Sequence, residues 1–538
     1  MVKLETTNNQ YYKWFSSVNV SIKGWFYVEE TYYEGEKATL FFESVVDEFG
    51  FIEKLRRMNG NFSIIFRSEN FTYAAVDRIM SFPLLYTQVH KDVIISDNTT
   101  LILQHDKTNK TVFERNQEML ASGFVAGNST IFDKIKLIQA GNLIVINNVN
   151  SNIVMKKYFD HLHKDPYEKS MDELCVLHEE VLNNVFKRMI KSLNGKQIVL
   201  FLSGGYDSRL VAVMLKKLNY TNVTCISFGS KKLKDVRVAK SVADSLGYDW
   251  ILVENAREYI NSVSDTERFK NYIELTSNGF TLPYIQGIIA EKLIIDGLIG
   301  KNAVFISGNS GDVIEGDQFS RRFSSNKTYT IEDIIDAIID KHYTLMGESF
   351  STNTLFREII KNDLNIVEKQ SYNYEECQDI FENFNWKERQ SKYVVNDVRS
   401  FDTYLNNEWR LPLWDNDLVD FWLKVPTRMR EFRKLYYYCV RDEKYKTANV
   451  ETMFSVTRDV LKKRYMAIVK ILYPLRKVIE YFQNKTNFYG VSFKSYIKVI
   501  LYTKGYRTNT ITTRVLWLLK NYYDEMDGNT TKFLSKFF

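Results

Sequence analysis

Residues 197–208 read Gln-Ile-Val-Leu-Phe-Leu-Ser-Gly-Gly-Tyr-Asp-Ser, and this stretch decides the fold. The apolar run 197–202 predicts a buried strand, and the residues from about Ser208 predict a helix. The small side chains at 203–205 let backbone N–H groups and the helix N-terminus converge on an anion. The stretch therefore predicts a phosphate-binding loop at the carboxyl end of a strand.

The sequence around this loop alternates between strands and helices. A long helix is predicted over 171–193, strands over 223–228 and 250–253, and a further helix from Lys234. Such alternation predicts a parallel sheet with crossover helices. Ligands of these sheets bind beyond the carboxyl ends of the strands, which is where the loop lies.

The first 155 residues are instead rich in short alternating strands, which predict stacked β-sheets. These runs are separated by Gly, Asn and Asp turns and lie at 62–66, 73–77, 93–96 and 142–147. A polar linker follows at 158–167. Its His161 and His163 are a possible metal pair, but no further His or Cys lies nearby, so a metal site is not expected there.

A chain of 538 residues is too long for one hydrophobic core, so two or three domains are expected. The longest apolar stretches, 293–306 and 466–475, are interrupted well short of the roughly 20 residues that a membrane helix needs. The N-terminus lacks the apolar segment of a secretion signal. We therefore expect a cytoplasmic protein without a transmembrane segment.

The four cysteines are scattered along the chain, with no CxxC spacing and no adjacent histidine cluster. They are Cys175, Cys225, Cys377 and Cys439. This pattern argues against a zinc site and against a disulfide framework. We expect reduced cysteines buried in the core.

Basic residues gather near the C-terminus, where 462–538 contain 15 Lys and Arg against 4 Asp and Glu. A basic tail rich in Tyr and Phe could contact nucleic acid or an anionic membrane surface. The favoured interpretation is a solvated helical subdomain packed on the main body, because apolar residues recur at helical spacing over 468–479.

The sequence of the loop is typical of one class of nucleotide-binding site. It is not a Walker A loop, because no G-x-x-x-x-G-K-[ST] run occurs in the chain. S-G-G-x-D-S instead resembles the signature of ATP pyrophosphatases, which implies that the loop holds the leaving β- and γ-phosphates. Asp207 adds an anionic oxygen for Mg²⁺. The alternative is a Gly-rich turn in which Ser and Asp cap the helix.

Further segments narrow the resemblance to the asparagine synthetase family. Residues 305–312, Phe-Ile-Ser-Gly-Asn-Ser-Gly-Asp, resemble the family's S-G-x-G-x-D-E, and 409–415 resemble its R-x-P-F-x-D. Lys434 precedes Arg441 by seven residues, the spacing of the family's catalytic lysine and a following arginine. The resemblance covers roughly residues 20–441.

The resemblance implies ATP and Mg²⁺ as cofactors and assigns roles to particular residues. The implied catalytic residues are Lys434, Asp312 and Asp207, and the two aspartates also hold Mg²⁺. The implied nucleotide-binding residues are Leu202, Ser203, Gly204, Gly205, Asp207, Ser208, Phe228, Ser307 and Gly308. In this interpretation Lys434 neutralises charge on the α-phosphate as it becomes pentacovalent.

The N-terminal region resembles the class II glutamine amidotransferases, which implies an Ntn-type fold. The resemblance rests on 59–63, 77–86 and 123–141. Such glutaminases use an N-terminal cysteine as nucleophile. Position 2 is Val2, and no cysteine precedes Cys175. We infer a structural domain without glutaminase activity, so that ammonia or an amine comes from elsewhere, including a separate ammonia source.

Two departures lie in the second motif. Asn309 stands where asparagine synthetases carry glutamate, and Val313 replaces the glutamate after the aspartate. An amide cannot act as a general base. Either the amine arrives neutral, or the substrate is not aspartate and another residue takes the proton. The identity of the substrate carboxylate stays open: it could be a precursor in the biosynthesis of asparagine or another amino acid, or a sugar acid.

Together these observations predict a mixed α/β and α+β protein. The expected domains are a glutaminase-like domain of stacked β-sheets with helices (1–155), a doubly wound parallel-sheet ATP-pyrophosphatase domain with a helical C-terminal part (165–450), and a basic, mainly helical extension (451–538). The predicted activity is adenylation of a small-molecule carboxylate and its transfer to ammonia or another amine, forming AMP and pyrophosphate. Homodimerisation stays open.

Two rival functions remain at this stage. One is an ATP pyrophosphatase acting on RNA, supported by the basic tail alone, so no nucleic-acid partner is expected. The other is an inactive scaffold, suggested by Val2 and Asn309. A scaffold should not be stabilised by ATP with magnesium, whereas an RNA enzyme should bind RNA with a steep dependence on salt.

The absence of an N-terminal cysteine leads to a first prediction. The purified chain should release no glutamate from glutamine at rates comparable to ATP turnover, because position 2 offers no thiol nucleophile. A coupled glutamate assay measures this directly. Glutamate release that keeps pace with ATP consumption would contradict the inferred loss of glutaminase activity.

Overall fold

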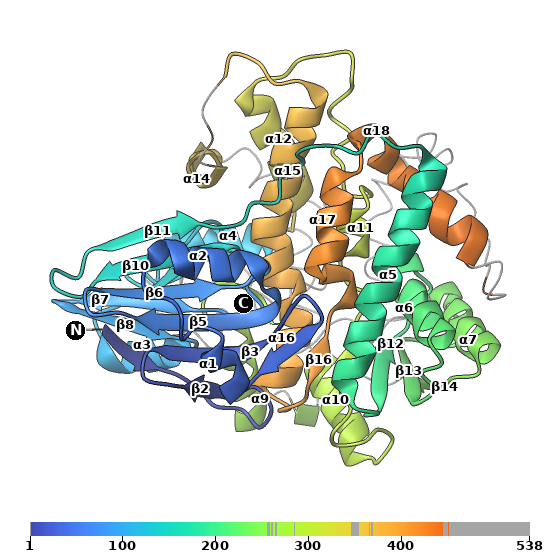
Figure 1. Ribbon diagram of the computed structural model, residues 1–538, viewed down its shortest axis with the longest axis horizontal. Coiled ribbons are helices and arrows are strands. Elements are labelled where there is room, and N and C mark those ends of the chain that lie inside the picture. The colour runs from blue at the N-terminus through green and yellow to red at the C-terminus, as the bar shows by residue number, and fades with distance from the viewer. Residues whose placement is uncertain are drawn as a thin grey trace, which may run out of the picture.

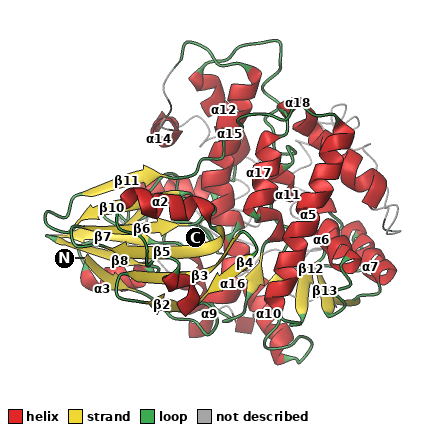
Figure 2. Ribbon diagram, in the orientation of Figure 1, coloured by secondary structure: helices red, strands yellow, loops and turns green. Residues whose placement is uncertain are grey.

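The computed structural model describes residues 2–254, 259, 262–263, 266–283, 286–345, 354–364, 366, 369–444 and 450. The predicted helical extension at 451–538 lies outside the described residues. None of the helices in the described part of the chain has the length and apolarity of a membrane span. Figures 1 and 2 show a layered N-terminal β-region beside a mixed region of helices and parallel strands.

Two β-sheets pack face to face in the N-terminal region. The first has the order β11 (Ile153–Lys157), β10 (Asn142–Asn147), β6 (Phe71–Val76), β5 (Asn59–Arg67), β3 (Val20–Val28) and β2 (Trp14–Ser16), with β4 (Thr31–Glu34) paired to β3. The second has the order β1 (Val2–Glu5), β8 (Asp92–Ser96), β7 (Leu85–Val89) and β9 (Lys136–Leu137). Their facing side chains, including Ile65, Val76, Leu85 and Ile95, share one buried cluster. This confirms the predicted stacked sheets.

Short helices accompany these sheets. They are α1 (Glu36–Leu40), α2 (Glu48–Arg57), α3 (Thr99–His105) and α4 (Phe113–Ser122). Phe51 and Leu55 of α2 pack on Phe62 and Ile64 of β5, on the face turned away from the second sheet. The larger sheet is therefore covered on both sides, which explains why its central strands are buried along nearly their whole length.

A third sheet, which is parallel, forms the centre of the following region. Its order is β14 (Asp249–Val253), β13 (Val223–Phe228), β12 (Ile198–Phe201), β15 (Val304–Ile306) and β16 (Trp409–Arg410), with every pair parallel. The chain starts at β12 in the middle, builds outward to β14, and then returns to the other side of β12. This confirms the doubly wound parallel sheet, and the winding reverses between β12 and β15.

Three helices of this region begin where the sequence predicts them or close by. They are α5 (Met171–Leu193), α6 (Tyr206–Lys217) and α7 (Lys234–Leu246). Apolar residues of all three pack with the strands of the parallel sheet in one continuous core. The N-terminus of α5 is closed by a capping box, in which Ser170 and Glu173 satisfy each other's backbone N–H groups.

The rest of the described chain is mainly helical. It comprises α9 (Glu267–Ser277), α10 (Gln286–Ile295), α11 (Gly311–Ile314), α12 (Ile331–His342), α14 (Thr354–Leu364), α15 (Tyr374–Phe384), the π-helix η1 (Asn385–Val394), α16 (Asn396–Thr403), η2 (Pro412–Trp414), α17 (Asn416–Lys424), α18 (Thr427–Arg430), η3 (Glu431–Arg433), α19 (Lys434–Tyr436) and the π-helix η4 (Tyr437–Lys444). Helix α17 packs against α5, which places the C-terminal helices next to the parallel sheet (Figure 1).

Polar side chains join the N-terminal sheets to this second region. Asp415, at the start of α17, forms an ion pair with Arg188 of α5 and accepts a hydrogen bond from Asn59 of β5 at 3.0 Å. Arg78 pairs with Asp420 at 2.6 Å. The two regions therefore share a buried polar interface in addition to apolar contacts.

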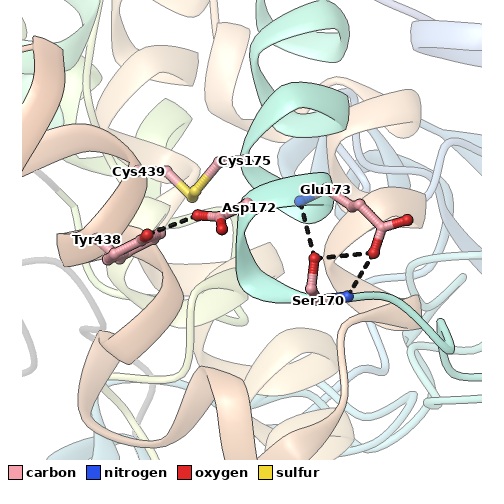
Figure 3. The surroundings of a disulfide bond; sticks show 6 residues. All are labelled: Ser170, Asp172, Glu173, Cys175, Tyr438 and Cys439. Carbon is pink, nitrogen blue, oxygen red and sulfur yellow. Dashed lines mark hydrogen bonds between the residues drawn. A yellow bond between two sulfur atoms is a disulfide. The ribbon is translucent and has the colours of Figure 1, made fainter.

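Two of the four cysteines form a disulfide, so the prediction that all four are reduced was wrong. Cys175 of α5 is bonded to Cys439 of η4, 264 residues later in the chain (Figure 3). The sequence could not indicate this pair, because only tertiary packing brings α5 and η4 together. Cys225 and Cys377 are buried free thiols, as expected.

The buried ion pair between the two regions leads to a second prediction. Asp415→Ala should lower the free energy of unfolding by about 3 kcal/mol, because it leaves the buried Arg188 guanidinium short of its main partner and removes the cap of α17. Asp417→Ala is the control, since Asp417 contacts the same arginine but is 53% exposed, and it should cost under about 1 kcal/mol. Urea titration followed by tryptophan fluorescence measures both. Equal effects would contradict the role assigned to Asp415.

Candidate functional site

A pocket of about 490 Å³ opens at the carboxyl ends of β12, β13 and β15. This is the point where the winding of the parallel sheet reverses, the usual ligand position in such folds. Its lining is Phe201, Leu202, Ser203, Gly205, Asp207, Ser208, Ile226, Ser227, Phe228, Leu233, Asp235, Val236, Ser307, Gly308, Asn309, Ser310, Asp312 and Asp397. The structure thus brings together all the residues predicted to contact the nucleotide except Gly204, which belongs to the loop but does not line the pocket.

The loop at 203–208 has the geometry of an anion cradle. Gly205 occupies the N-cap position of α6, and no side chain caps the helix there. Inside the loop, the N–H of Ser203 donates to Ser208 Oγ at 3.1 Å, and the N–H of Gly205 donates to Ser203 Oγ at 3.1 Å. Because the cap residue Gly205 has no side chain, the N-terminus of α6 can face a bound phosphate. The alternative of a side-chain-capped turn is not what the structure shows.

Gly204 explains why glycine is required in this turn. A Cβ at this position would lie 2.8 Å from the Cα of Asp235, which belongs to the first turn of α7. The contact is with backbone, so it cannot be relieved by rotating a side chain. The glycine therefore allows the loop and α7 to pack closely below the pocket.

The two predicted metal ligands lie in the same pocket. Asp207 comes from the first turn of α6, and Asp312 from the first turn of α11 after β15. Burial raises the pKa of Asp207, as does the negative charge of Asp312, whereas Arg433 lowers it. Oxygen ligands from two converging carboxylates suit a hard cation such as Mg²⁺.

Glu315 is a third acid at this site that the sequence analysis missed. It lies three residues after Asp312, is 1% exposed, and its carboxylate contacts the Arg433 guanidinium. Burial raises its pKa well above the ordinary range. The position directly after Asp312 holds Val313 and not an acid. Glu315, two positions after Val313, supplies a carboxylate instead. The signal in the sequence was the i, i+3 spacing of the two acids, which lie one helical turn apart.

The cation found at Asp207 is Arg433 and not Lys434. Arg433 contacts both Asp207 and Glu315 and is 4% exposed. Lys434 is exposed and is not among the described residues that line the pocket. Its predicted catalytic role therefore stays a prediction, and it would require Lys434 to move towards the nucleotide. The motifs of the sequence assigned no role to Arg433.

Asp397 is a second residue that the sequence analysis missed. It comes from α16, is 2% exposed, lines the pocket, and accepts a hydrogen bond from Asn309 Nδ2 at 2.8 Å. Burial raises its pKa to about 7. Asn309 is itself held in place because its backbone carbonyl accepts from Trp414 Nε1 at 3.1 Å. Since Asp397 lies 88 residues after Asn309, no spacing in the sequence connects them.

The pocket carries a strong negative charge. Four carboxylates line it, those of Asp207, Asp235, Asp312 and Asp397, and none of its described lining residues is Lys, Arg or His. Such a site does not hold a polyphosphate unless cations accompany it. The lining thus fits a nucleotide that arrives with Mg²⁺.

The histidines of the linker lie elsewhere. His163 contacts the carboxylate of Asp379, and Glu382 lies nearby, so the structure brings acids of α15 to this histidine. However, Arg430 donates to both carboxylate oxygens of Glu382, at 3.1 and 3.0 Å. Arg430 thus pairs with Glu382, and His163 contacts Asp379, so both acids of this cluster have partners among its own side chains.

Comparison with known proteins agrees with the geometry of the pocket. A family model described as asparagine synthase matches residues 180–359, which include both strand ends that build the pocket. This supports a domain of the asparagine synthase type, as found in ATP-dependent amide-forming ligases. No curated protein matches the chain.

Two solved structures share a distant likeness. One is a glutamine phosphoribosylpyrophosphate amidotransferase from B. subtilis complexed with ADP and GMP, 9% identical, with a TM-score of 0.18, over 55% of this chain and 63% of that one. The other is described as the allosteric regulatory enzyme of purine biosynthesis, 12% identical, with a TM-score of 0.19, over 57% of this chain and 59% of that one. The chain spans about three fifths of each, and likeness at this level carries no conclusion about function.

The packing behind the loop leads to a third prediction. Gly204→Ala should lower the midpoint of thermal unfolding without nucleotide by a few degrees, corresponding to about 1–3 kcal/mol, because its Cβ would overlap the backbone of Asp235. Gly205→Ala is the matched control, because its Cβ would meet only Ser203 Oγ at 3.1 Å, and φ at Gly205 is −74°. Differential scanning calorimetry compares them. The prediction fails if the two variants unfold at the same temperature.

Proposed function

We propose that the chain is an asparagine synthetase-like ligase, which activates a carboxylate as an acyl-adenylate and joins it to ammonia or another amine. One observation carries the proposal. The ends of β12 and β15 lie side by side where the winding of the sheet reverses, and this places the loop at 203–208, with its Asp207, next to Asp312. These two strand ends lie within the segment that resembles asparagine synthases.

In this proposal ATP occupies the pocket with its phosphates on the loop at 203–208 and its base near Leu202 and Phe228. Asp207 and Asp312 would hold Mg²⁺, which shields the charge of the leaving pyrophosphate when bound. The excess of carboxylates in the lining supports this arrangement.

The proposed reaction has two steps. An oxygen of the substrate carboxylate attacks the α-phosphorus, and the bond to the β-phosphate oxygen breaks, releasing pyrophosphate into the loop. The amine then attacks the acyl carbon, AMP leaves, and the amine loses a proton. Lys434 stays the predicted cation for the α-phosphate, although it lies outside the pocket in the structure.

We assign the acceptance of this proton to Asp397. Asn309 cannot serve as a base, but its amide orients the Asp397 carboxylate towards the same part of the pocket. A pKa of about 7 suits a group that must take a proton near neutral pH and release it again. Of the two explanations left open by Asn309, the structure favours another residue acting as base.

The described residues do not favour the rival functions. The case for a scaffold rested partly on Asn309 in the altered second motif. Glu315 and Asp397 supply buried carboxylates near this motif, although Asn309 and Val313 do not. The case for an RNA enzyme rested on the basic tail, which lies outside the described residues. Amide formation on a small molecule therefore remains the function with the most support.

A product assay tests the proposed function. The full chain is incubated with ATP labelled at the α-phosphate, Mg²⁺, ammonia and a panel of carboxylates, and the products are separated and identified by mass spectrometry. We expect labelled AMP, pyrophosphate and an amide. Asp207→Ala and Asp312→Ala should each lose most of this activity. Formation of ADP instead of AMP would refute the adenylation mechanism.

The role of Asp397 gives a fourth prediction. Asp397→Asn should lower turnover by at least ~100-fold with little change in the KM for ATP, because it removes a general base. In the unaltered chain, turnover should fall as the pH drops below about 7, since only the ionised carboxylate accepts a proton. Asp402→Asn is the control, because Asp402 is a buried acid of the same helix that does not line the pocket. Equal losses in the two variants would contradict the assignment.

A further inference from the structure

We propose that Arg433 is a built-in counter-ion of the nucleotide pocket, and that the Cys175–Cys439 disulfide holds it in place. Breaking the disulfide would release Arg433 and free Asp207 for a divalent cation. This inference rests on the proposed function in one respect, namely that the pocket binds ATP with Mg²⁺.

The first step in the argument is the position of the guanidinium. Arg433 contacts Asp207 and Glu315 together, so its charge lies on the carboxylate predicted to hold Mg²⁺. The Tyr436 ring, 4.1 Å from the guanidinium carbon, covers it on one side. A guanidinium and a divalent cation that need the same carboxylate oxygen compete for it. Arg433 in this position therefore weakens the site for Mg²⁺.

The second step concerns the backbone that carries Arg433. Phe432 and Arg433 have φ angles of 55° and 58°, so two successive residues other than glycine adopt the left-handed conformation. This conformation is unfavourable for residues other than glycine, and it persists only if the surrounding contacts hold it. The Phe432 side chain is 62% exposed and contributes little to holding it. The restraint must come from the contacts of Arg433 itself and from the residues that follow it.

The third step identifies an anchor on the C-terminal side. Cys439, six residues after Arg433, is bonded to Cys175, and the neighbouring Tyr438 hydroxyl donates to Asp172 Oδ1 at 2.6 Å. Figure 3 shows that both links reach the beginning of α5. That end of α5 is fixed by its capping box, so the anchor is rigid. The disulfide is the covalent link of this anchor.

The chemistry of release is an ordinary thiol–disulfide exchange. A dithiol donates two electrons and two protons, the Cys175–Cys439 bond is replaced by two thiols, and the dithiol becomes a disulfide. Cys175 is half-buried and Cys439 is buried, so attack is expected at the Cys175 sulfur. After reduction, the strained turn at 432–433 can relax and withdraw the guanidinium from Asp207.

Binding measurements on the full chain in two redox states test the inference. Alkylation of free thiols followed by mass spectrometry first verifies which cysteines are bonded before and after treatment with dithiothreitol. Calorimetry then measures the binding of Mg²⁺ with an ATP analogue that cannot be cleaved between the α- and β-phosphates. We expect the reduced chain to bind about 5-fold or more tightly than the oxidised chain.

Three variants separate the disulfide from other effects of the reductant. Cys175→Ser combined with Cys439→Ser should bind as tightly as the reduced chain in both conditions. Cys377→Ser, which removes a buried free thiol, should retain the full redox response. Arg433→Met combined with Glu315→Gln should bind tightly and lose the redox response. The paired change avoids leaving the buried Glu315 carboxylate without its cation.

Hydrogen exchange without nucleotide gives an independent measurement. Amides of residues 434–440 should exchange faster in the reduced chain, whereas those of β12 should not change. If both redox states bind the analogue equally, or if residues 175 and 439 prove to be free thiols in the untreated protein, the inference is wrong. If neither state binds the analogue, the proposed function fails. In that case, unchanged exchange at 434–440 would separately refute the proposal that the disulfide holds Arg433 in place.

Discussion

Close backbone packing between the end of β15 and the first turn of α6 is the constraint on which the pocket depends. A Cβ at Gly308 would lie 2.5 Å from the backbone nitrogen of Ser208, and one at Gly311 would lie 2.9 Å from Asp207 Cγ. Because these positions are glycine, the two strand ends approach closely enough for Asp207 and Asp312 to share one site. The reversal of the parallel sheet between β12 and β15 leaves the space that the pocket fills.

Charge balance is the second feature that organises this part of the molecule. Carboxylates from α6, α11 and α16 converge on the pocket region, and Arg433, which precedes α19, contacts Asp207 and Glu315. Burying several acids together is costly unless cations accompany them. The position of the C-terminal helices, held to α5 by the disulfide and to the N-terminal sheets by Asp415, therefore affects the electrostatics of the site.

Local patterns predicted much of the architecture. The helix over 171–193, the strand over 223–228 and the helix beginning at Lys234 agree with α5, β13 and α7, because hydrophobic periodicity and capping residues act over short distances. The loop at 203–208 and the segment ending at Asp312 could also be placed at strand ends. Glu315 could have been found from its spacing to Asp312, one helical turn away. Asp397 and Arg433 could not be assigned to the site, because each reaches it through tertiary packing, and α16 lies far along the chain from Asn309.

The sequence by itself determined the kinds of element, the parallel sheet and the glycine-rich loop at the end of β12, since these follow from side-chain size, period and turn chemistry within about 20 residues. Only the tertiary structure decided which cation faces Asp207, which acid faces Asn309, and that Cys175 and Cys439 are bonded. The physical reason is that ion pairs, hydrogen bonds and disulfides depend on distances of a few ångströms in space. Residues 264 positions apart come that close only after the helices have packed.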